Sequence, residues 1–117
     1  MKHLEVLNNL VTFSKPTKDL AEELSKIDWD YTGQPMIVLA FHIKSVLQRF
    51  LGGEYDSDEL ENWANLIECR EDLEFESTQK NIIENIIYSL ANPVLEGEIT
   101  VDLCKEFIKQ IDKSGTE

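Results

Sequence analysis

Apolar residues recur three and four positions apart along most of the chain, a spacing that places side chains on one face of an α-helix. In the first segment Leu4, Leu7, Leu10 and Val11 form one such stripe. Five further segments repeat the pattern, and the alternation expected of a strand never persists beyond about four residues. The predicted helices are residues 3–13, 17–27, 35–51, 57–68, 78–91 and 101–113.

The third predicted helix, 35–51, is the most apolar part of the chain. Met36, Ile43 and Leu47 lie on one broad face, and further apolar residues widen that face. Pro35 suits the first turn of a helix, where its missing N–H is not needed. We therefore expect the third helix to be central and buried, with neighbours on several sides.

Residues that favour helix ends and turns separate these segments. Side chains that can cap a helix N-terminus stand at three starts, namely Thr17, either Asp56 or Ser57, and Thr100. We expect irregular connections at 28–34, 71–76 and 94–98. Together these features predict an all-α fold, a single compact domain of about five to six helices. It occupies residues 1–113, and 114–117 form a flexible tail.

Negative charge is concentrated in one stretch. The chain carries a formal net charge of −12, and ten carboxylates but only one base, Arg70, lie between Glu54 and Glu76. Such a chain repels nucleic acid and anionic membranes, and it favours a basic protein partner. The carboxylates are Glu54, Asp56, Asp58, Glu59, Glu61, Glu68, Glu71, Asp72, Glu74 and Glu76.

Aromatic residues in the same stretch could anchor a partner. Tyr55 and Phe75 are candidates for this role, because aromatic residues are enriched where binding energy is concentrated. Trp63 shares the helical spacing of Leu60 and Ile67, which predicts a place in the core. The predicted partner-binding residues are therefore the ten carboxylates together with Tyr55 and Phe75.

No pattern of catalytic or metal-binding residues accompanies the acidic stretch. The carboxylates after Asp56 do not form a calcium loop, since the twelfth position holds Ile67 instead of a bidentate glutamate. Cys69 and Cys104 are not spaced as a zinc pair, and His42 lies on a polar strip without a partner at motif spacing. We predict no catalytic residues, no metal site and no cofactor.

The location predicted from the sequence is the cytoplasm. The first fifteen residues lack the long apolar core and cleavage site of a signal peptide, and no apolar run is long enough to span a membrane. The two cysteines do not form a close pair, which suits a reducing compartment.

Residues 46–53 (VLQRFLGG), 58–68 (DELENWANLIE) and 70–72 (RED) carry a resemblance to a known family. They resemble acidic bacterial proteins that look like the immunity proteins of polymorphic toxin systems, including contact-dependent growth inhibition. Residues 90–93 (LANP), with Gly97 and Thr100, extend the resemblance. It implies a cytoplasmic, non-enzymatic antidote that binds a cognate toxin domain; the acidic stretch indicates that this domain is basic, as in a nuclease (RNase or tRNase).

Two other functions are compatible with the same sequence. An acidic regulatory module could imitate nucleic acid and occupy a DNA- or RNA-binding protein. A small metal-dependent enzyme could use the clustered carboxylates for catalysis. The first differs from an immunity protein only in its partner, and the second would require a metal ion to bind the acidic stretch.

Overall fold

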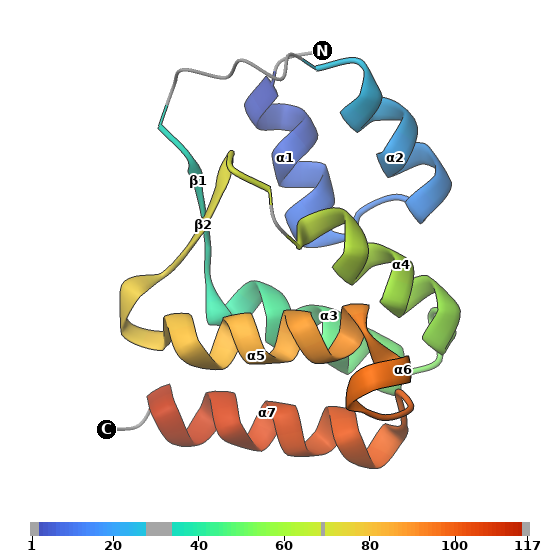
Figure 1. The fold of residues 1–117 in the computed structure, drawn as a ribbon, viewed down its shortest axis with the longest axis vertical. Coiled ribbons are helices and arrows are strands. Elements are labelled where there is room, and N and C mark those ends of the chain that lie inside the picture. Colours follow the sequence, from blue (N-terminus) through green and yellow to red (C-terminus); the bar gives the residue numbers. More distant parts are fainter. Residues whose placement is uncertain (1–2, 28–33, 69, 116–117) are drawn as a thin grey trace.

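The computed structural model describes residues 3–27, 34–68 and 70–115, so most of the predicted 28–34 connection lies outside it. The described chain is mostly helical and contains two short strands (Figure 1). The elements in order are α1 (His3–Thr12), α2 (Thr17–Ser25), β1 (Met36–Val38), α3 (Ala40–Leu51), α4 (Ser57–Ile67), β2 (Leu73–Phe75), the 3-10 turn η1 (Ser77–Gln79), α5 (Lys80–Ala91), α6 (Pro93–Glu96) and α7 (Val101–Gly115).

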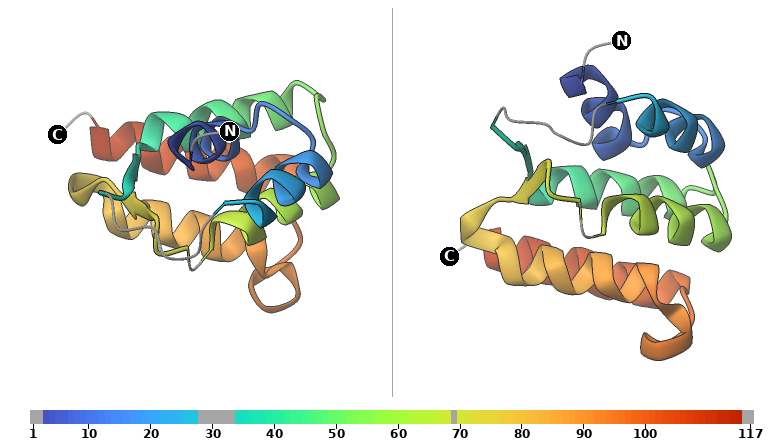
Figure 2. Two further views of the ribbon diagram at one scale, coloured as in Figure 1. Left: turned by 90° about the horizontal axis from the view of Figure 1, so that it is seen from above. Right: turned by 45° about the horizontal axis from the view of Figure 1, so that its top comes forward.

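The helices form three tiers, which the right-hand view of Figure 2 shows most clearly. One outer tier consists of α1 and α2, the middle tier of α3 and α4, and the other outer tier of α5 and α7. Each tier packs against the next, so the predicted all-α single domain is confirmed in its broad architecture. No helix in the described part of the chain is both long and apolar enough to cross a bilayer.

A two-stranded parallel sheet corrects two of the predicted elements. Met36 to Val38 form β1 rather than the first turn of the third helix, and they pair with Leu73 to Phe75, which form β2 rather than an irregular connection. The register places Met36 opposite Leu73 and Val38 opposite Phe75. Three-residue strands are too short to show a period, and parallel partners this far apart in sequence leave no local signal.

The third helix occupies the middle tier, as predicted, but α5 buries more of its surface. Ala40, Ile43, Val46 and Leu47 of α3 are buried, whereas Phe41 is 69% exposed. Helix α5 lies between α4 and α7 and buries residues along most of its length. The buried residues of α5 are Ile83, Ile86, Ile87, Ser89, Leu90 and Ala91.

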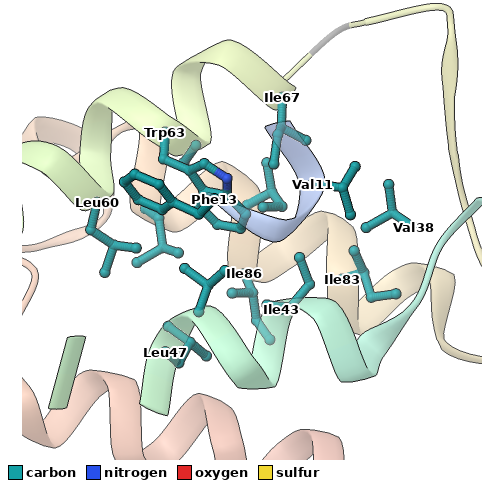
Figure 3. Packing of buried hydrophobic residues seen from close by; sticks show 14 of the residues in the cluster. Val11, Phe13, Val38, Ile43, Leu47, Leu60, Trp63, Ile67, Ile83 and Ile86 are labelled. Carbon is teal, nitrogen blue, oxygen red and sulfur yellow. The ribbon is translucent and has the colours of Figure 1, made fainter. Parts of the chain in front are cut away.

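Trp63 is fully buried at the centre of the core, as predicted. Its indole N–H donates to the backbone carbonyl of Leu10 at 2.7 Å, which links α4 to α1. The ring of Phe13 stacks on Trp63, with centroids 5.6 Å apart (Figure 3). Phe13 has a φ of 51°, and its carbonyl oxygen accepts from Arg49 Nη2 at 3.0 Å, so the unusual backbone at the end of α1 is held from α3.

The helix ends follow the sequence in some places and depart from it in others. Asp56 and Thr100 accept hydrogen bonds from the backbone N–H groups of Glu59 and Leu103, so both predicted caps are confirmed. Thr17 is not a cap, because Pro16 precedes α2 and the Thr17 hydroxyl donates to Glu59 instead, at 2.8 Å. The short helix α6 begins at Pro93 and takes up the first part of the predicted 94–98 loop, and α7 continues beyond residue 113 to Gly115.

Candidate partner-binding surface

The acidic stretch does not form one patch, because α4 separates it into two ends. The eleven residues of α4 extend over about 16 Å. At its N-terminal end, Glu54, Asp56 and Glu59 line a small hollow beside Phe13 and Lys15. At its C-terminal end, Glu68 and Glu74 line a larger groove. A partner would therefore meet two separate acidic regions.

Most carboxylates at the N-terminal end of α4 already form hydrogen bonds or ion pairs within the fold. Glu54 lies 2.6 Å from Arg49, Glu59 accepts the Thr17 hydroxyl, and Asp56 caps α4. Asp58 and Glu61 remain on the outward side of α4, with Asp58 exposed and Glu61 half-buried. This end keeps fewer carboxylates for a partner than the sequence predicts.

Tyr55 is held inside this end rather than presented as an anchor. Its ring stacks on Phe13 with centroids 4.5 Å apart, and its hydroxyl donates to the backbone carbonyl of Val46. Arg49 lies over the same ring at 5.5 Å. Burial raises the pKa of the Tyr55 hydroxyl well above its ordinary value. The arrangement makes Tyr55 a packing residue that joins α1 to α3.

The groove at the other end has a volume of about 680 Å³ and lies between the end of α4, strand β2 and the outward face of α5. Four partly or fully buried apolar residues line it, namely Ile67, Leu73, Phe75 and Ile87. Three carboxylates from three elements also line it: Glu68 of the α4 C-cap, Glu74 of β2 and Glu84 of α5. Tyr88, which is 43% exposed, completes the α5 side.

Two bases also line the groove without neutralising it. Arg70 donates through Nε and Nη2 to the two oxygens of Asp72, each at 2.8 Å. Lys80 lies 3.8 Å from Glu84, one helical turn away on α5. An exposed ion pair such as Lys80–Glu84 contributes little free energy. Glu84 can therefore release Lys80 and pair with a lysine or arginine of a partner. The groove therefore keeps an excess of negative charge.

Asp72 differs from the other carboxylates, because its side chain is only 9% exposed. It accepts from Arg70 and lies 2.9 Å from Nε2 of His3, which joins the start of α1 to the start of β2. Burial alone would raise the pKa of Asp72, but the hydrogen bonds from Arg70 and His3 outweigh that effect and lower it. Asp72, which the sequence predicts as part of the binding surface, thus has its charge satisfied within the fold.

The remaining predicted residues lie beside the groove or at its rim. Phe75 is half-buried in β2 and lines the groove, Glu71 is exposed in the turn before β2, and Glu76 is half-buried after it. Glu84 and Tyr88 were missed by the sequence analysis. Their signal was the polar face of α5, where Lys80, Asn81, Glu84, Asn85 and Tyr88 follow helical spacing.

The two side chains that could carry chemistry, His42 and Cys104, are partly and fully buried in the fold. The ring of His42 accepts the Leu39 N–H through Nδ1 at 3.0 Å, and burial lowers its pKa despite the opposing charge of Glu76. Cys104 is buried as a free thiol, and burial raises its pKa to about 11. Among the described residues, no three His, Cys, Asp or Glu side chains gather closely enough to hold a metal ion.

Comparison of the chain with protein-family models, with curated proteins and with solved structures gave no match.

Proposed function

We propose that this chain is an immunity protein that binds a cognate, basic toxin domain and neutralises it by covering its substrate-binding face. The observation that supports this proposal most strongly is the convergence of Glu68, Glu74 and Glu84 on one groove. Three successive parts of the chain supply these carboxylates, namely the end of α4, β2 and α5. The proposal assigns the chain a binding function and no enzymatic activity.

The charge of the groove indicates the kind of toxin. A nuclease must attract a polyanion, so its active-site face carries lysine and arginine. Carboxylates placed where phosphates would lie can use the same field to attract the nuclease. We therefore propose a nuclease, acting on RNA or tRNA, as the toxin.

Apolar contacts would slow the dissociation of the complex. Charge mainly accelerates encounter, whereas desolvated anchors slow dissociation. Tyr88 is half-exposed beside the groove, and Phe75 lies half-buried within it, so the pair offers an aromatic surface next to the carboxylates. In this proposal Tyr88 takes the anchoring role that the sequence suggested for Tyr55.

The experiment is a titration of toxin activity. The proposal predicts a gene for a nuclease toxin domain beside the gene for this chain, and that domain would be purified with its nuclease activity intact. We expect a stoichiometric amount of the chain to abolish cleavage, and excess tRNA to weaken inhibition, because both bind the same face. If the toxin cleaves its substrate as fast with a saturating amount of this protein as without it, the proposal is wrong. If excess tRNA does not weaken the inhibition, the protein does not cover the substrate-binding face.

A further inference from the structure

Strand β2 has one edge paired and the other directed away from the sheet. Met36 N–H donates to the Asp72 carbonyl at 3.0 Å, and Glu76 N–H donates to the Val38 carbonyl at 3.0 Å. In a parallel ladder, alternate residues of a strand point their backbone groups at the same neighbour. Glu74 therefore faces β1, and the N–H and C=O groups of Leu73 and Phe75 face the opposite side.

These outward backbone groups belong to the residues that form the groove. All three residues of β2 line it, and α5 and the end of α4 form its other sides. Within the described part of the chain, no backbone group bonds to the N–H or C=O of Leu73 or Phe75. Two donors and two acceptors thus belong to residues that line the groove, whose volume lies within the range of sites that enclose small ligands.

We propose that the groove binds an extended, basic segment of a partner protein, which adds to β2 as a third strand. This inference rests on the proposed function only for the identity of the partner, the toxin domain. The added strand would pair its backbone with Leu73 and Phe75, about 4.8 Å away. Its side chains would project alternately, so that lysine or arginine can reach Glu74, Glu68 and Glu84.

The negative charge around β2 favours a basic segment of another protein over a second copy of the same chain. An open strand edge is a general hazard for association, and proteins protect such edges with charged side chains. Here Glu74 lies at the centre of β2, and the chain as a whole has a net charge of −12. Two copies would repel each other at this edge, whereas a basic segment would be attracted to it.

The test uses the full chain, labelled with ¹⁵N, and three capped hexapeptides. The first alternates lysine and valine, the second replaces lysine with glutamate, and the third is the lysine peptide methylated on its backbone nitrogens. We expect the lysine peptide to shift the amide signals of Leu73 and Phe75 most and to slow their hydrogen exchange. The glutamate peptide should not bind, and the methylated peptide should bind at least about tenfold more weakly, because it cannot form a ladder.

Matched variants separate the groove from general charge attraction. Glu74→Lys with Glu84→Lys should weaken binding of the lysine peptide about tenfold or more, whereas Glu22→Lys with Glu106→Lys should leave it unchanged. Three results would overturn the inference: equal binding of the methylated peptide, largest shifts at the N-terminal end of α4, or no binding of the lysine peptide up to about 1 mM. These measurements use no toxin, so their failure is distinguishable from failure of the toxin titration.

Discussion

The carboxylate of Glu68 accepts a hydrogen bond from Asn92 Nδ2 at 3.1 Å, which joins the end of α4 to the end of α5 beside the groove. The same amide nitrogen donates to the Tyr88 carbonyl at 2.9 Å, so one side chain holds both helices. Sequence alone could not reveal this contact, because its partners are separated by 24 positions. Its effect is to fix one groove carboxylate in place.

Replacing Asn92 with alanine should loosen this junction. Asn92→Ala removes both donated hydrogen bonds and should lower the free energy of unfolding by about 1–2 kcal/mol, mainly through the partly buried bond to the charged Glu68, since the bond to the Tyr88 carbonyl is exposed. Urea denaturation measures the change. Asn62→Ala on the exposed side of α4 is the control and should change stability by less than about 0.5 kcal/mol. If the two variants change the free energy of unfolding equally, the hydrogen bonds of Asn92 do not contribute to stability.

The apolar side of α3 should tolerate truncation far less than its exposed side. Ile43 and Leu47 are fully buried, so Ile43→Ala or Leu47→Ala should each cost about 2–5 kcal/mol. Phe41→Ala removes a larger side chain that is 69% exposed and should cost less than about 1 kcal/mol. Thermal or urea unfolding monitored by circular dichroism compares the three variants. A larger loss for Phe41→Ala than for the buried pair would contradict the packing described for α3.

The indole N–H of Trp63 should contribute to stability separately from its ring. Trp63→Phe keeps an aromatic ring but leaves the buried Leu10 carbonyl without this donor, and the smaller ring leaves a void. The Leu10 carbonyl keeps the hydrogen bond from the Phe13 N–H, so we expect a loss of about 2–4 kcal/mol from the missing indole hydrogen bond and the lost packing together. Phe13→Leu, which removes stacking on the same residue but no hydrogen bond, provides the comparison. A neutral result for Trp63→Phe would show that the hydrogen bond does not stabilise the core.

Asp72 should make stability fall in acid. Its pKa in the folded chain is lowered from the ordinary 3.8, so its contribution is fully present above that value and is lost as pH falls through the lower folded-state pKa. Asp72→Asn should therefore destabilise the chain at pH 7, and the two unfolding free energies should converge once pH has fallen below the lowered folded-state pKa of Asp72. Asp58→Asn at an exposed position is the matched control. Curves that stay parallel down to low pH would contradict an ionised, hydrogen-bonded Asp72.

The structural features that the sequence predicts correctly depend on residues that lie close together in the chain. Asp56 and Thr100 were recognised as caps because a cap needs only the N–H groups two or three residues ahead. Trp63 was recognised as core because its helical spacing aligned it with Leu60 and Ile67. These features set the helical architecture, and the structure confirms them.

Contacts between distant segments account for what the sequence could not predict. The pairing of Met36 with Leu73 turned one predicted helical turn and one predicted connection into strands. The sequence predicts Asp72 as a surface carboxylate, because its contact with His3 joins residues that are 69 positions apart. Glu84 is not among the predicted residues, because the sequence does not indicate that α5 turns back beside β2 after the short turn η1.

The measurement that tests the central claim most directly is the association rate of the toxin domain with charge-reversed variants at low and high salt. We predict that Glu74→Lys with Glu84→Lys slows association at least about tenfold at low salt, and that high salt reduces the difference. The matched pair Glu22→Lys with Glu106→Lys should stay within about twofold of the unmodified chain. Unchanged association for the groove pair, or a larger effect from Asp58→Lys with Glu61→Lys at the other end of α4, would contradict the groove as the toxin-binding surface.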